Sequence, residues 1–266
     1  MRITGIGHLL FAAGLAGLGV LSLFSGDFAF VWQPVPAGVP WREALARASG
    51  VILLAGGFGM LLRRPGAAFA LAMAAYLLSW VVLLQSPRVA HAPANIGAWL
   101  GFCENLVLVC GGWTLFASLA GPQAGLLAGS GARRTARLLL GASCLVLGLS
   151  HFAYTGGTAS MIPAWIPFHT GFAYLTGAGH LAAGAGILLS VVPRLAATLE
   201  ALMISTFVAL IHIPGVLGAP GRLQWTMLFV ASALAGAVWI VAKSLEGLPW
   251  GPAPRAPAAQ GPREAS

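Results

Sequence analysis

Charged residues are scarce in this chain of 266 residues. Asp, Glu, Lys and Arg make up only 8% of the sequence, whereas hydrophobic residues make up 58%. Soluble globular domains carry about 25% charged residues, so this composition excludes an ordinary soluble domain. It indicates instead a protein whose helices are surrounded by lipid.

Cysteine is also rare, with three residues in the whole chain. Cys103 and Cys110 lie in one hydrophobic run, too far apart along a helix axis for a disulfide, and Cys144 lies in another run. The sequence contains no Cys-x-x-Cys pair, P-loop, GxGxxG, HExxH or GxSxG pattern. These absences argue against a thiol–disulfide enzyme, a nucleotide enzyme and a hydrolase of the soluble type.

Long hydrophobic runs dominate what is present. Each is about 20 residues long, the length that a helix needs to cross about 30 Å of hydrocarbon. The sequence therefore predicts an all-α fold, a polytopic membrane bundle of eight transmembrane helices. The predicted spans are 4–24, 45–62, 67–86, 97–118, 134–152, 171–190, 194–213 and 223–243.

The basic residues are distributed unequally between the predicted loops. The net charge is +8, and the surplus lies on the side that holds both termini, which excludes a nucleic-acid surface as its cause. Basic residues favour the cytoplasmic side, so we expect both termini in the cytoplasm. Ten lie on this side: Arg2, Arg63, Arg64, Arg133, Arg134, Arg137, Arg194, Lys243, Arg255 and Arg263. Four lie on the other side: Arg42, Arg47, Arg88 and Arg222.

An internal duplication organises the chain. Residues 51–89 align with 178–216 without a gap, and "PAGVPW" from Pro36 aligns with "PAWIPF" from Pro163. Each half has four spans, an even number, so the repeats should be parallel. The predicted organisation is a first repeat (1–120), a cytoplasmic linker (121–133), a second repeat (134–243) and a disordered cytoplasmic tail (244–266). The glycine-rich second span of each half is expected inside the bundle.

The second span of each repeat carries the residues of a family resemblance. "HLAAGAGILL" (His180 to Leu189), and more weakly "LLAGGFGMLL" (Leu53 to Leu62), resemble the DoxX superfamily. The resemblance implies a bacterial inner-membrane protein associated with redox enzymes, in some members as a quinone-reactive subunit. The family often has a glutamate where His180 stands.

Ionisable residues in the predicted spans are the candidate site, because such residues are costly in hydrocarbon. His180 lies near the middle of its span, His169 lies three turns before it, and His151 and His212 lie at the outer boundary. Glu200 lies deeper in the seventh span. The first repeat has no titratable column at the matching positions, which are Phe24, Arg42, Gln85, Leu53 and Met73.

Several chemistries fit these residues. We expect a quinone-linked redox subunit in which His180 exchanges a proton and Glu200 relays it, with His151, His169 and His212 as further ligand contacts. The histidines are also compatible with haem ligation, a transition-metal site, or structural hydrogen bonds. The alternative functions are a small-solute transporter or channel, or a scaffold for a redox partner protein.

Glu104 is the one acidic residue expected in the hydrocarbon of the first repeat. It is counted among the candidate ligand contacts. Its expected partners are Arg88, Arg47 or His91, in a structural ion pair or a proton relay.

Overall fold

The computed structural model describes residues 4–251, and this part of the chain forms helices with no strand. The expected tail therefore lies outside the described residues from position 252 onward. The helices are α1 (Ile6–Ser25), α2 (Arg42–Met60), α3 (Gly66–Trp80), α4 (Ser86–His91), α5 (Ile96–Ala120), α6 (Ser130–Ala153), α7 (Thr155–Met161), α8 (His169–Leu188), α9 (Pro193–Phe207), α10 (Ile213–Gly218) and α11 (Arg222–Ser244). Two π-helical turns, η1 (Val81–Gln85) and η3 (Val208–His212), and one 3₁₀ turn, η2 (Pro122–Ala124), complete the set.

Seven helices of the described chain are long and apolar enough to cross a membrane. Two of these seven are continuous runs in which α3, η1 and α4, or α9, η3 and α10, follow one another. The α8 helix is not among the seven, although it is 20 residues long. Its two histidines and five glycines lower its hydropathy.

The long helices form two rings of four, and the last helix of each ring, α5 or α11, also packs against the other ring. In the first ring α1 packs on α2, α2 on α3, and α3 on α5. In the second ring α6 packs on α8, α8 on α9, and α9 on α11. The rings are joined because α1 packs on α11, α5 packs on α6, and α5 packs on α11.

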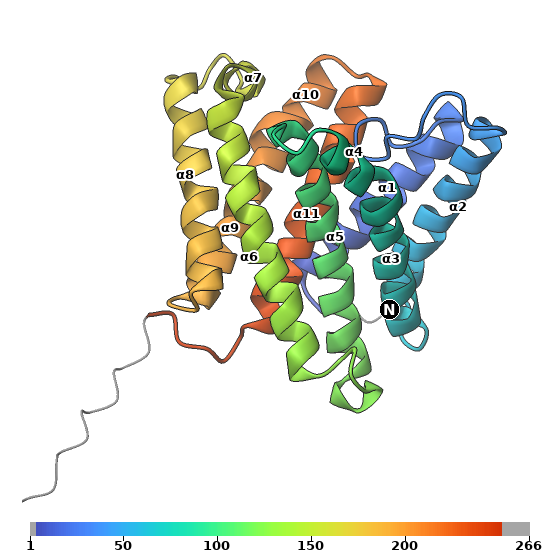
Figure 1. Cartoon of the computed structure of the whole chain (residues 1–266), viewed down its shortest axis with the longest axis vertical. Coiled ribbons are helices and arrows are strands. Elements are labelled where there is room, and N and C mark those ends of the chain that lie inside the picture. Colours follow the sequence, from blue (N-terminus) through green and yellow to red (C-terminus); the bar gives the residue numbers. More distant parts are fainter. Residues whose placement is uncertain (1–3, 252–266) are drawn as a thin grey trace, which may run out of the picture.

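The centre of the molecule is made by the fourth long helix of each ring. The most hydrophobic windows of α5 and α11 are 72% and 67% buried, against 44% for α2. Figure 1 places α2 and α8 at opposite edges of the molecule. The expectation that the glycine-rich second spans lie inside the bundle is therefore wrong, since their glycines allow close approach to a neighbouring helix without burial on all sides.

Glycine is needed where such a neighbour comes close. A Cβ added to Gly50 of α2 would lie 2.9 Å from the carbonyl oxygen of Gly19 in α1. A Cβ added to Gly177 of α8 would lie 3.2 Å from the carbonyl oxygen of Gly148 in α6. Close contact between backbones is the usual way in which small residues stabilise helix pairs in lipid.

Element boundaries recur in the register of the sequence repeat. The run α3, η1 and α4 occupies 66–91, and the run α9, η3 and α10 occupies 193–218, so both bounds are displaced by the same offset along the chain. Both runs carry their π-helical turn at the same place. The residues before α2 and α8, Trp41 and Phe168, are related by that offset too, and both have a left-handed backbone, with φ of 53° and 57°.

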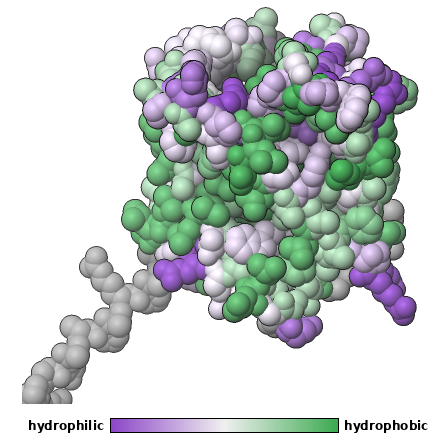
Figure 2. All heavy atoms as spheres, turned by 45° about the vertical axis from the view of Figure 1, so that its right-hand side comes forward, coloured by the Kyte–Doolittle hydropathy of each residue, from purple (hydrophilic) through white to green (hydrophobic). Residues whose placement is uncertain are grey.

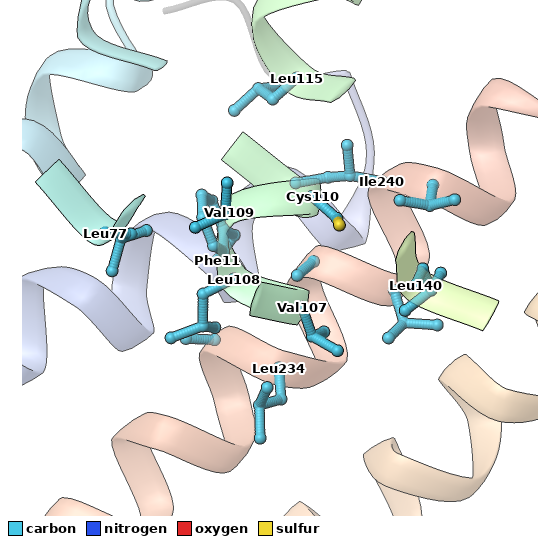
Figure 3. Close-up of a cluster of buried hydrophobic side chains, with 14 of the residues drawn as sticks. Phe11, Leu77, Val107, Leu108, Val109, Cys110, Leu115, Leu140, Leu234 and Ile240 are labelled. Atoms are coloured by element: carbon cyan, nitrogen blue, oxygen red, sulfur yellow. The ribbon is translucent and has the colours of Figure 1, made fainter. Parts of the chain in front are cut away.

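The interior of the first ring is filled by apolar side chains from α1, α2, α3 and α5. Phe11, Leu15, Leu53 and Leu77 are all fully buried there. The packing continues along α5 between the rings, where Leu108 and Cys110 belong to the same buried cluster as residues of α11 and α6 (Figure 3). The second ring is different, because part of its interior is a cavity.

Polar residues gather at the two ends of the molecule, with an apolar band between them (Figure 2). Both described chain ends lie at one end, which we call the termini end (Figure 1). The opposite end carries α4, α7, α10 and the long segment between α1 and α2. That segment is fixed by Asp27, which forms ion pairs with Arg42 of α2 and Arg222 of α11.

Burial by itself would raise the pKa of the Asp27 carboxyl. Hydrogen bonds from Arg222, from the Phe28 amide and from Arg42, together with the charge of Arg222, outweigh burial and hold this pKa below its ordinary value. Asp27 is therefore charged at neutral pH and links the first ring to the second.

Candidate functional site

A cavity of about 410 Å³ lies inside the second ring, in the half away from the termini end. Its walls come from α5, α6, α8, α9, η3 and α11, and α7 lies at its outer rim. Most of the lining is apolar. The polar or titratable side chains that line it are Glu104, Ser150, His151, Tyr154, Thr158, Thr176, His180 and His212.

His180 is held by a carboxylate from the neighbouring helix. Its Nδ1 lies 2.6 Å from Oε1 of Glu200, and the two side chains are 2% and 0% exposed. A carboxylate on Nδ1 fixes the ring and directs Nε2 away from it, and Nε2 has no partner among the described residues. Since His180 lines the cavity and Glu200 does not, the imidazole presents the pair to a ligand.

The surroundings of Glu200 leave it little alternative to His180. Its second oxygen, Oε2, is buried without a hydrogen-bond partner in the described chain, and Cys144 of α6 lies beside the carboxylate. A buried carboxylate with one strong partner depends on that partner for its stability. We therefore treat His180 and Glu200 as one unit, the His180–Glu200 dyad.

His151 packs against the dyad from α6. Its ring lies edge to face with that of His180, with 5.0 Å between the centroids, and Phe207 of α9 contacts both rings. The Thr176 hydroxyl lies 2.8 Å from the carbonyl oxygen of Phe172, to which it donates, and 2.9 Å from Nδ1 of His151. The hydroxyl then accepts from Nδ1–H of His151, which leaves Nε2 of His151 as an acceptor.

His212 and Glu104 approach the cavity from two further elements. His212 is the last residue of the π-helical turn η3, and Glu104 belongs to α5, outside the second half of the chain. The expected partners of Glu104 are not found. Arg88 donates to Gln85 and Arg47 pairs with Glu43, so Glu104 has no ion pair among the described residues.

His169 is not part of the cavity. It is the first residue of α8, and its Nε2 lies 3.2 Å from the carbonyl oxygen of Pro163. The three turns of helix between His169 and His180 place the two rings in different surroundings. Of the six sequence candidates, the structure brings five together and gives His169 a local contact.

Trp32 lines the cavity although sequence analysis did not select it. Its carbonyl oxygen accepts from Gln85 of η1 and Asn105 of α5, at 3.1 and 3.3 Å, which fixes the segment that carries it. Gln85 occupies the position of the first repeat that aligns with His212, and it is fully buried. At this repeat position, Gln85 thus holds a neighbouring segment by a hydrogen bond in the first ring, whereas His212 lines the cavity in the second ring.

The dyad is also replaced in the first ring. The positions that align with His180 and Glu200 are Leu53 and Met73, which are 0% and 3% exposed. In the first ring, these two apolar side chains of similar size take the place that the dyad has in the second ring. The titratable pair is therefore not required to build a ring of this kind.

Thr176, Tyr154 and Phe207 were also missed as cavity residues. Thr176 lies one turn before His180 and Tyr154 lies just after His151, so proximity in sequence was the available signal. Phe207 directly precedes the π-helical turn that ends at His212, and this turn shifts the register of the residues in it and after it. An α-helical projection of the sequence does not include that shift.

Comparison with known proteins gives one match. Residues 140–242 match a family model described as a domain of unknown function (DUF8561), which includes His151, His180, Glu200 and His212 but not Glu104. No curated protein and no solved structure matches the chain. The second half of this protein is thus similar to a domain family to which no activity is attached.

Proposed function

We propose that this chain is a DoxX-like integral membrane protein in which two four-span repeats are fused in the same orientation. The recurrence of element boundaries and π-helical turns in the register of the sequence repeat supports this proposal. The contacts between the repeats support it too. The first helix of each repeat packs on the last helix of the other, α1 on α11 and α6 on α5. In this proposal α8 is also a span and brings the seven long apolar helices to eight, since its 20 residues extend for about 30 Å.

The same proposal places the protein in the bacterial inner membrane with its termini end in the cytoplasm. Among the described residues, the turns and helix ends at the termini end carry Arg63, Arg64, Arg133, Arg134, Arg137, Arg194 and Lys243. The opposite end carries four arginines. Two of these share Asp27 and a third pairs with Glu43, so fewer positive charges are left uncompensated there.

For the cavity, the function that the geometry supports best is binding of a quinone that exchanges a proton with the His180–Glu200 dyad. The observation that carries it is a largely apolar cavity lined by His180, a carboxylate-bound imidazole whose Nε2 is free. A quinone ring is apolar on its faces and accepts hydrogen bonds at its oxygens. His180 can donate a proton to such an oxygen, and Glu200 stabilises the charged ring.

The chain supplies protons in this proposal, and its electrons come from elsewhere. Reduction of a quinone to a quinol requires electrons from a redox partner protein, because the sequence has no dinucleotide fingerprint. His151 and His212 contact the ligand from the cavity walls, and Glu104 is the second group able to exchange a proton with it.

Two alternatives fit the geometry less well. A transporter needs a path from the cavity to the termini end, but Cys144, Ala197, Ala201 and Ala235 in the helices around the dyad are all 0% exposed and so do not line such a path. A haem held between His151 and His180 needs a porphyrin between their rings. These rings are in edge-to-face contact, which leaves no space for it.

The test measures binding of a short-chain benzoquinone to the full chain in mild detergent. Quenching of tryptophan fluorescence is the signal. Trp32 lines the cavity and reports occupancy, and Trp32→Phe identifies its share of the signal. We expect saturable binding that His180→Gln weakens about tenfold, the loss of about 1.4 kcal/mol. The matched control is His91→Gln, an exposed histidine at the end of α4. Equal binding by the two variants contradicts the site, and no saturable binding by the native chain favours the scaffold.

A further inference from the structure

A second cavity, of about 490 Å³, lies at the termini end of the molecule. It is formed by the first turn of α1, the last turns of α5 and α11, and the start of α9, so it lies where the two rings meet. We call it the basal cavity. It shares no lining residue with the cavity inside the second ring that His180 lines, which we call the quinone cavity after the proposal above.

Two basic side chains line the basal cavity. Arg194 of α9 lies with its guanidinium 4.0 Å from the ring centre of Trp250, and one of its nitrogens donates to the carbonyl oxygen of Leu248 at 3.1 Å. The Trp250 ring and this carbonyl hold the guanidinium in place and leave its other N–H groups available. Lys243 of α11 has only a long contact, 3.4 Å, with the exposed Glu246. An exposed ion pair of this kind contributes little.

The neighbouring polar groups add further donors. The first turn of α1 has no side-chain cap, and Gly5, Ile6 and Gly7 at that turn line the cavity. The Lys243 side chain lies beside Gly5. Uncapped amides at the start of a helix favour an anion, and the residues that carry them line the same cavity as Arg194 and Lys243.

Of the remaining walls, the polar side chains are Thr4, His8, Ser118, Thr198, Ser244 and Glu246, whose carboxylate lies beside Lys243, and the other side chains are apolar. Leu115, Ile240 and Trp239 continue the lining toward the middle of the molecule, and Trp250 at the rim is half exposed. A cavity with cations at its mouth and apolar side chains below suits an amphipathic anion better than a small inorganic one. Basic pockets between helices on the cytoplasmic side of a membrane bind lipid headgroups in this way.

We propose that the basal cavity binds a phosphate group, that of an anionic phospholipid headgroup, between Arg194 and Lys243. Bound there, the lipid contacts α1 of the first ring and α9 and α11 of the second, and so stabilises the junction between the rings. This proposal rests on the membrane location of the chain and is independent of the quinone cavity.

The experiment measures thermal unfolding of the full chain in detergent with added phosphatidylglycerol, phosphatidylcholine or inorganic phosphate. At saturating lipid we expect phosphatidylglycerol to raise Tm by about 5 °C and phosphatidylcholine to leave it unchanged. The shift is measured for each variant against its own lipid-free Tm. A variant that is destabilised but folded therefore still gives a valid result.

Arg194→Gln/Lys243→Gln should lose the phosphatidylglycerol shift. The matched control is Arg63→Gln/Arg64→Gln, which removes the same charge from the exposed turn between α2 and α3. An undiminished shift in the first variant, or an equal loss in the control, overturns the site. An equal shift with inorganic phosphate keeps the phosphate site and overturns the lipid as its source. A failure of quinone binding changes none of these results.

Discussion

The double variant His180→Leu/Glu200→Met converts the dyad into the residues that the first ring has at the matching positions. Leu53 and Met73 are buried and well packed there, so the substituted side chains are of a size that such a ring accepts. Each single variant instead removes one member of the dyad and leaves the other buried without its partner. We expect the two single variants to be less stable than the double variant.

The magnitude follows from the geometry of the dyad. His180 and Glu200 are 2% and 0% exposed at the side chain and 2.6 Å apart, so neither gains solvent when its partner is lost. Removing one member of a buried pair costs about 3–5 kcal/mol, whereas replacing both by apolar residues is neutral or stabilises by about 1–4 kcal/mol. The coupling free energy between the two sites should therefore exceed about 3 kcal/mol.

The assay is equilibrium unfolding of the native chain, both single variants and the double variant in mixed micelles of mild detergent and dodecyl sulfate. The surface pair Glu43–Arg47, in which both side chains are exposed, serves as a control cycle. Its coupling should stay below about 1 kcal/mol. Additive losses at His180 and Glu200, or a single variant as stable as the native chain, would refute the view that they form one unit.

Three further predictions concern other parts of the molecule. A Cβ on Gly14 would lie 2.6 Å from the backbone of α11, so Gly14→Ala should lower the free energy of unfolding by about 1–3 kcal/mol. In the same assay Gly131→Ala, whose Cβ meets nothing within 4 Å, should be neutral or slightly stabilising. Asp27→Asn should lower Tm at pH 7, where the lowered pKa keeps Asp27 charged between Arg42 and Arg222. The difference in Tm between the native chain and Asp27→Asn should shrink as the pH falls below about 3.9, and it should disappear once the pH has passed through the lowered pKa of Asp27. A difference in Tm that persists at that pH would contradict the role of the charge. Finally, Trp32→Ala should weaken quinone binding several-fold while the Tm shift with phosphatidylglycerol is kept, because Trp32 lines one cavity and not the other.

The long helices could be predicted from the sequence because hydrophobic length is a local property. The expected span 97–118 lies within α5 and 134–152 within α6. Which helices occupy the centre could not be predicted in this way. Glycine content placed α2 and α8 inside, whereas α5 and α11 are the central helices, because close approach to one neighbour does not require burial on all sides.

The candidate site was predicted in part. The cost of ionisable groups in hydrocarbon identified His180 and Glu200, but the 2.6 Å contact between them depends on the rotation of α8 against α9. That rotation is fixed by packing and leaves no local sequence signal. His169 was grouped with His180 by helical spacing alone, and three turns of helix separate it from the cavity.

The most direct test of the quinone proposal is photoaffinity labelling of the native chain in lipid nanodiscs with an azido-benzoquinone, mapped by mass spectrometry. The proposal predicts labels on cavity residues such as Tyr154, Met161 and His212, removed by excess unlabelled quinone and absent from His180→Leu/Glu200→Met. Labels that are spread over the lipid-facing sides of α2 and α3, or that persist under competition, would contradict a quinone site in the second ring.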